Sequence, residues 1–79
     1  MKITVTADHV ARGTRTACMH CPVAFAYTEL TGHLCWVFDG RLKDLATQQI
    51  FRLPGTVVGH IVYYDLTGEM DPFSFELAA

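Results

Sequence analysis

Two cysteines with a metal-ligand spacing lie near the start of the sequence. Cys18 and Cys21 have the C-x-x-C spacing that can place two thiolates on one zinc ion, and His33 and Cys35 are the pair that could complete four ligands. A second C-x-x-C pair is absent from the 79 residues. We therefore expect small buried thiols and no cofactor, and we keep a zinc-stabilised structural module as an alternative.

The same two cysteines could also form a redox pair, because a helix N-terminus lowers the pKa of a thiol. Pro22 follows the second cysteine directly, and proline is typical of the first turn of a helix. The sequence thus predicts that Cys21 caps a helix, which favours a structural role over redox chemistry.

The segment best suited to bind an anion is residues 12–16, just before that helix. It offers two guanidinium groups, two hydroxyls and a glycine next to the positive end of the helix dipole, although the Walker and Rossmann glycine patterns are absent. Aromatic rings could stack on a base if a subunit boundary brought them near. The predicted ligand-binding residues are Arg12, Thr14, Arg15, Thr16, Trp36 and Tyr63.

No set of residues has the spacing of a catalytic centre. His60 has no serine nucleophile beside it, and Asp65, five residues further on, lies on a different helical face. Asp8 and His9 are adjacent, and neighbours in sequence do not face each other. We therefore expect a protein that is not an enzyme.

Composition limits the partners. The formal net charge of −2 argues against a general nucleic-acid binder, and no apolar run approaches the roughly 20 residues that span a bilayer. Hydrophobic residues make up 51% of the chain and charged residues 18%, so a homo-oligomer that covers an apolar face is expected. The expected location is the cytoplasm, where three cysteines would remain thiols or metal ligands.

Periodicity and turn signals predict a single α+β domain over residues 1–79. We expect strands at 2–7, 34–38 and 73–77, and helices at 22–31 and 57–67. A hairpin at Asp39-Gly40 leads into residues 41–53, which form one bent strand or two. Asp8 is expected to cap a short helical turn that Gly13 ends in a left-handed conformation.

The resulting order, β-α-β-β-α-β, is that of the ferredoxin-like split βαβ fold. In that fold two helices cover one face of a mixed sheet, and the first and third strands lie at its centre. Such a sheet leaves one face bare, and self-association would cover it.

From residue 3 to residue 77 the chain resembles a family of short proteins encoded by bacteriophages. The matching segments are Ile3-Thr4-Val5-Thr6, His9-Val10, Arg12-Gly13, Cys18-x-x-Cys21-Pro22-Val23-Ala24 and Pro72-Phe73-Ser74-Phe75-Glu76-Leu77. The resemblance implies a phage protein in the cytoplasm of an infected bacterial host. By analogy, small phage proteins often occupy a component of the host.

Three functional hypotheses follow. The first is a non-catalytic counter-defence protein that sequesters a small anionic ligand, such as a nucleotide immune messenger, between subunits. The second is an anti-CRISPR-like inhibitor that binds a host defence nuclease complex, and the third is the zinc-stabilised module. In the second hypothesis, an acidic face of the protein competes with nucleic acid for the host complex. That face would consist of Asp39, Asp44, Asp65, Glu69 and Asp71.

Overall fold

The computed structural model describes residues 1–78 and confirms the α+β class. Its elements follow the order β-α-α-β-β-β-α-β. They are β1 (Lys2–Val5), α1 (Ala7–Arg12), α2 (Pro22–Thr31), β2 (Cys35–Phe38), β3 (Arg41–Asp44), β4 (Ile50–Arg52), α3 (Gly55–Thr67) and β5 (Phe73–Glu76).

The strands form two antiparallel sheets, so the expected single mixed sheet is wrong. β1 pairs only with β5, whereas β2, β3 and β4 form a three-stranded meander in that order. Residues 41–53 therefore contain two strands. Sequence periodicity predicts a strand and its buried face but not its partner, and here short turns return β3 along β2 and β4 along β3.

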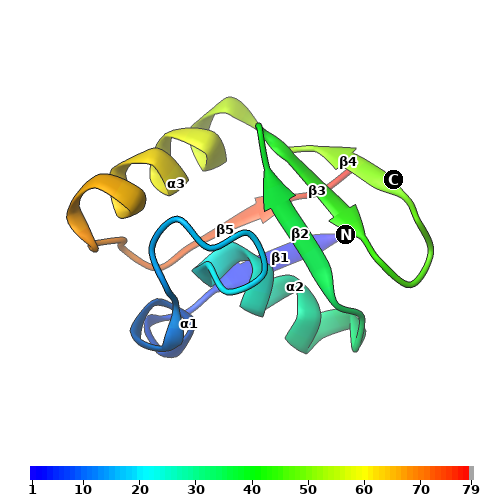
Figure 1. The fold of residues 1–79 in the computed structure, drawn as a ribbon, viewed down its shortest axis with the longest axis horizontal. Coiled ribbons are helices and arrows are strands. Elements are labelled where there is room, and N and C mark those ends of the chain that lie inside the picture. The colour runs from blue at the N-terminus through cyan, green and yellow to red at the C-terminus, as the bar shows by residue number, and fades with distance from the viewer. Residues whose placement is uncertain (79) are drawn as a thin grey trace.

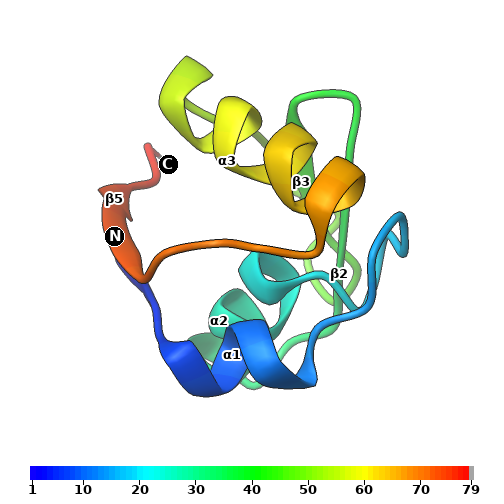
Figure 2. The same cartoon turned by 90° about the vertical axis from the view of Figure 1, so that its left-hand side faces the viewer.

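Helix α2 lies between the two sheets and contacts β1 on one side and β2 on the other (Figures 1 and 2). Its predicted ends are confirmed. Cys21 is the N-cap, with its Sγ accepting a hydrogen bond of 3.4 Å from the N–H of Ala24, and Gly32 ends the helix with a φ of 77°. A helix placed between two sheets must be apolar on both sides, and Val23, Ala26 and other α2 residues are accordingly buried.

The short helix α1 starts at a different cap from the one expected. Thr6, and not Asp8, is the N-cap: its Oγ1 accepts from the N–H of His9 at 3.3 Å, and His9 Nδ1 accepts from the N–H of Thr6 at 3.0 Å. This is a capping box in which histidine takes the place of Glu or Gln.

Gly13 follows α1 with a φ of −68°, so the expected left-handed conformation is wrong. A Cβ at this position would lie 2.7 Å from Tyr64 Oη and 2.8 Å from Pro22 Cδ. Glycine is therefore required at this position by close packing.

The predicted helix at 57–67 is confirmed as α3, which runs along the upper side of the molecule in Figure 1. It buries Val57 and Tyr64 and exposes Val62 and Leu66 on its other face. In the described residues 1–78, no helix has both the length and the apolar character needed to cross a bilayer.

Candidate functional site

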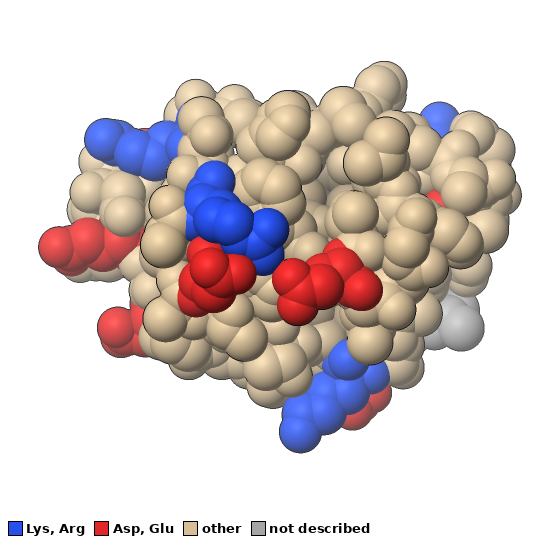
Figure 3. Space-filling view, turned by 90° about the horizontal axis from the view of Figure 1, so that it is seen from below, with Lys and Arg blue, Asp and Glu red and all other residues tan. Residues whose placement is uncertain are grey.

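Arg12 is held by two carboxylates. Its Nε lies 2.9 Å from Asp8 Oδ2, its Nη2 lies 3.1 Å from Glu29 Oε2, and its guanidinium group lies 5.3 Å from the centre of the Phe25 ring. Figure 3, which views the molecule from the side where α1 and α2 lie, shows basic side chains next to acidic ones. Arg12 therefore joins α1 to α2 and is already neutralised.

Arg15 is bound to the end of α3. Its Nε donates to the carbonyl oxygen of Asp65 at 3.1 Å and its Nη2 donates to that of Leu66 at 2.8 Å. The N–H of Thr16 donates to Asp65 Oδ1 at 2.9 Å. Arginine at a helix C-terminus satisfies carbonyls that the helix leaves unpaired, so Arg15 fastens the loop after α1 to the end of α3.

The space beneath this loop is poorly suited to an anion. A cavity of about 200 Å³ is lined by Thr16, Cys18, Ile61 and Asp65 among others, and neither arginine lines it. The Asp65 carboxylate in its wall would repel a phosphate.

The six predicted ligand residues belong to separate surroundings. The N–H of Thr14 donates to the carbonyl of His20 at 2.7 Å, Trp36 lies on β2, and Tyr63 lies on α3 with its hydroxyl 3.5 Å from Glu69 Oε2. Within residues 1–78, no hydrogen bond, ion pair or cavity joins Trp36 or Tyr63 to residues 12–16. Only Arg15 and Thr16 share a partner, Asp65.

The four candidate zinc ligands, Cys18, Cys21, His33 and Cys35, do not gather. Among residues 1–78, no group of three or more His, Cys, Asp or Glu side chains is arranged to hold a metal ion. Burial raises the pKa of Cys21 and raises that of Cys35 to about 12, so both are thiols at neutral pH in the metal-free chain and are unsuited to attack disulfides. The zinc-stabilised module therefore stays a prediction without a matching ligand group among residues 1–78.

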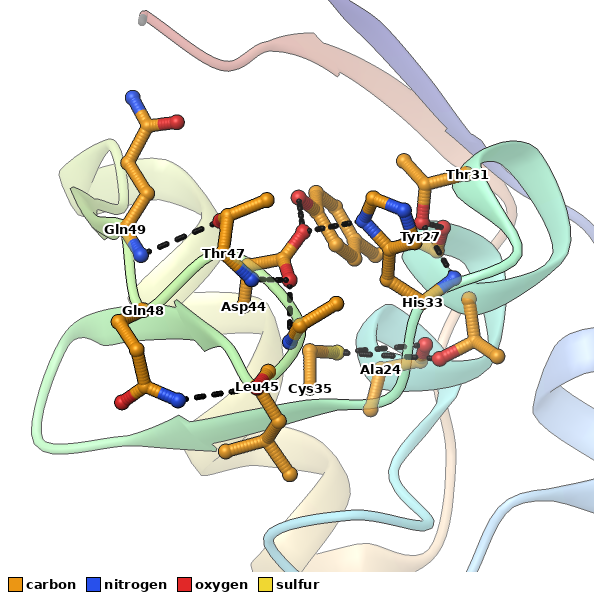
Figure 4. A network of polar contacts seen from close by, with 12 residues as sticks. Ala24, Tyr27, Thr31, His33, Cys35, Asp44, Leu45, Thr47, Gln48 and Gln49 are labelled. Carbon is orange, nitrogen blue, oxygen red and sulfur yellow. Dashed lines mark hydrogen bonds and ion pairs between the residues drawn. The ribbon is translucent and has the colours of Figure 1, made fainter.

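Asp44 is the centre of a buried polar network (Figure 4). The side chain is on the inner face of β3, and the residue is 1% exposed. Its Oδ2 accepts from the Tyr27 hydroxyl at 2.5 Å and lies 2.8 Å from His33 Nδ1, while its Oδ1 accepts from the N–H groups of Ala46 and Thr47 at 2.8 and 3.0 Å.

These contacts fix Asp44 as a carboxylate. Burial opposes its ionisation, but the hydrogen bonds from Tyr27, His33 and the two backbone N–H groups outweigh burial and hold the pKa below its usual range. Burial and the bond to Asp44 raise the pKa of Tyr27. The network joins α2 to β3 and to the turn before β4, and its burial removes Asp44 from the proposed acidic face.

The other face of the same three-stranded sheet is open to solvent. We call its six outward-pointing residues the outer sheet face. Cross-strand pairing arranges them in two rows, one with Trp36, Lys43 and Ile50 and one with Phe38, Arg41 and Arg52. This face carries three of the six Lys and Arg residues of an acidic chain.

The outer sheet face combines exposed aromatic rings with cations. Trp36 and Phe38 are 43% and 37% exposed, and their rings meet edge to face with centroids 6.3 Å apart. Arg41 lies 3.5 Å from Asp39 at the adjacent turn, and in the described chain neither Lys43 nor Arg52 has an ion-pair partner. Rings stack on planar bases and free cations bind phosphates, so this face has both groups that a nucleotide needs.

Sequence reasoning found Trp36 but missed the other residues of this face. The signal was the alternation in three consecutive segments, in which the outward positions are aromatic at 36 and 38, basic at 41 and 43, and apolar then basic at 50 and 52. The alternation predicts a common surface only when the pairing register of the three strands is known. A shift of one residue would move a strand's side chains to the opposite face of the sheet. No protein-family model, curated protein or solved structure matches the chain.

Proposed function

We propose that this protein is a non-catalytic binding protein that holds a nucleotide-type anion on the outer sheet face. The observation that carries the proposal is the exposure of Trp36 and Phe38 beside three cations. With the resemblance to short phage proteins, the role we propose is counter-defence by sequestration of a nucleotide messenger.

The typical energies of stacking and of ion pairing favour an anion that carries a base over a simple anion such as inorganic phosphate. Stacking of one base on an aromatic side chain contributes about 1–3 kcal/mol, while an exposed ion pair contributes about 1 kcal/mol or less. The net charge of −2 also weakens the long-range attraction of any anion, so short-range contacts on the outer sheet face must supply the affinity. Selectivity would therefore come from stacking, and the cations would fix the phosphate.

Thermal unfolding with a ligand panel tests the proposal. The panel contains AMP, ATP, GMP and UMP, with adenosine and ribose 5-phosphate as matched ligands that lack one of the two groups. A nucleotide at 100 times its Kd should add about 2.7 kcal/mol to the free energy of unfolding, and adenosine and ribose 5-phosphate should add less. No shift with any nucleotide would contradict the proposal.

Self-association through α3 is the second part of the proposal. Gly59, Val62, Tyr63 and Leu66 are spaced at i, i+3, i+4 and i+7, and all are exposed. Among residues 1–78, a Cβ on Gly59 would meet nothing within 4 Å, so none of their contacts requires glycine there. A second copy of the helix could approach closely over Gly59 and cover the apolar side chains.

Sedimentation equilibrium of Leu66→Glu and Gly59→Ala tests this contact. Both variants should shift the protein toward monomer, and the alanine should stabilise the monomer by about 0.5–1 kcal/mol. An unchanged mass distribution for both would exclude this surface.

A further inference from the structure

We propose that the ligand of the outer sheet face is a single-stranded nucleic acid. Its phosphates would follow β3 over Arg41 and Lys43, and its bases would lie over Trp36 and Phe38 on β2. This inference rests on the proposed function, the binding of nucleotide-type anions on this surface, and it names an oligonucleotide strand instead of a small messenger as the preferred ligand.

The first observation is a pair of like charges. Arg41 and Arg52 are directly opposite each other in the register of β3 and β4. Like charges in that position destabilise a sheet. The nearest carboxylate is Asp39, 3.5 Å from Arg41 and with an 82% exposed side chain, and within residues 1–78 no carboxylate pairs with Arg52. A phosphate between the two guanidinium groups would convert this repulsion into two attractive contacts.

The second observation is a repeat. Trp36 is paired with Lys43, and Phe38 is paired with Arg41, so an aromatic ring and a cation stand side by side twice. Two residues along a strand span about 6.8 Å, so the two pairs are separated by roughly that distance. A nucleic-acid strand repeats a base and a phosphate in the same way, whereas a mononucleotide would use only one pair.

The third observation favours a single strand over a duplex. In a duplex the bases are stacked on one another, so their faces are not available to Trp36 and Phe38. A chain with a net charge of −2 and three clustered cations also matches a short contact of a few phosphates better than an extended duplex.

The test uses fluorescein-labelled octathymidylate and octaadenylate, a duplex of the two, and AMP and TMP as mononucleotides. Binding is followed by anisotropy and by quenching of Trp36, the only tryptophan in the chain. Three phosphate contacts predict a slope near −2 for log K against log salt concentration with the single strands. We expect both octamers to quench Trp36 and to bind more tightly than the duplex or the mononucleotides.

Three variants localise the contact. Arg52→Gln should reduce the salt slope by about 0.7, and Phe38→Ala should weaken octamer binding about 5- to 150-fold. Lys2→Gln is the matched control: this residue is an exposed cation on β1 of the other sheet, and its loss should leave the slope unchanged.

The outcomes separate the two proposals. Mononucleotides that bind as tightly as the octamers, with the same salt slope, would overturn the single-strand inference and leave the proposed function standing. Duplex binding equal to that of the single strands would also overturn the inference. If neither nucleotides nor octamers quench Trp36, both proposals fail.

Discussion

Lys43 and Asp44 are consecutive residues of β3, and they place opposite charges on opposite faces of one sheet in very different surroundings. Asp44 is buried and meets a tyrosine hydroxyl, a histidine and two backbone N–H groups. Lys43 lies in a row of exposed apolar side chains, beside two arginines that face each other. The inner charge is satisfied within the chain, whereas Lys43 and Arg52 have no ion-pair partner among residues 1–78 and Arg41 has only the exposed Asp39 at 3.5 Å.

This contrast separates stability from binding. A buried charge with partners stabilises the fold only while those partners remain, because an unpaired buried polar group is costly. Exposed cations without partners contribute little to stability and remain available to a ligand. Variants of the inner network should therefore change unfolding and leave binding intact, and variants of the outer sheet face should do the reverse.

The largest expected effect is the loss of stability in Asp44→Ala. The change removes the acceptor for Tyr27 and for the N–H groups of Ala46 and Thr47 together, and it leaves a hole beneath β3. The urea midpoint should fall further than in any other variant described in this Discussion. Asp71→Ala, which removes an exposed carboxylate without an ion-pair partner among residues 1–78, is the control and should leave the midpoint nearly unchanged. A small effect of Asp44→Ala would refute the structural role of the network.

Acid should weaken the same network. The pKa of Asp44 in the folded protein lies below its unfolded value of about 3.9. The ionised Asp44 therefore contributes fully to the free energy of unfolding above about pH 3.9. This contribution is lost as the pH falls from there through the pKa of the folded state. The difference in urea midpoint between the wild type and Asp44→Asn should therefore be constant near neutral pH and narrow below about pH 4. A difference that stays constant into strong acid would contradict the lowered pKa.

The Tyr27 hydroxyl should contribute less to the free energy of unfolding than the Asp44 carboxylate does. Tyr27→Phe removes one donor to Asp44 and should reduce the free energy of unfolding by about 1–3 kcal/mol. Each kcal/mol should lower Tm by roughly 4–8 °C. Tyr63→Phe removes an exposed hydroxyl on α3 and should change Tm by less than the scatter between melts. Equal changes in Tm for the two tyrosine variants would show that the buried hydroxyl contributes no more to stability than the exposed one.

The smallest effect on stability, and one of opposite sign, is expected for Arg52→Gln. Removing one of two facing guanidinium groups relieves repulsion, so the free energy of unfolding should rise by about 0.2–1 kcal/mol. Nucleotide binding should weaken in the same variant. A variant that loses both stability and binding would show that Arg52 supports the fold, and the contrast between the two faces would fail.

The parts of the fold that sequence predicted well depend on local chemistry. Cys21, Pro22 and Gly32 set the ends of α2, and the hairpin at Asp39-Gly40 is confirmed, with φ of 48° and 71° at its two residues. Each signal acts within a few residues, so no knowledge of distant partners is needed.

The parts that sequence could not predict depend on distant partners. Two separate sheets form because β1 pairs with β5 from the other end of the chain, and no local pattern specifies that choice. Arg15 looked like an anion ligand in sequence, but the last carbonyls of α3, about 50 residues away, satisfy it. The outer sheet face was likewise hidden until the register of three strands was known.

The pairing of β1 with β5 also bears on how the chain folds during synthesis. Thr4 and Ser74 are opposite each other in this sheet and share a hydrogen bond of 3.0 Å. A growing chain cannot close this pair until residue 76 has left the ribosome, whereas the meander of β2, β3 and β4 needs only local hairpins. The open edge of β1 therefore remains unpaired through most of translation, and a nascent chain is most exposed to proteases and misassembly in that interval.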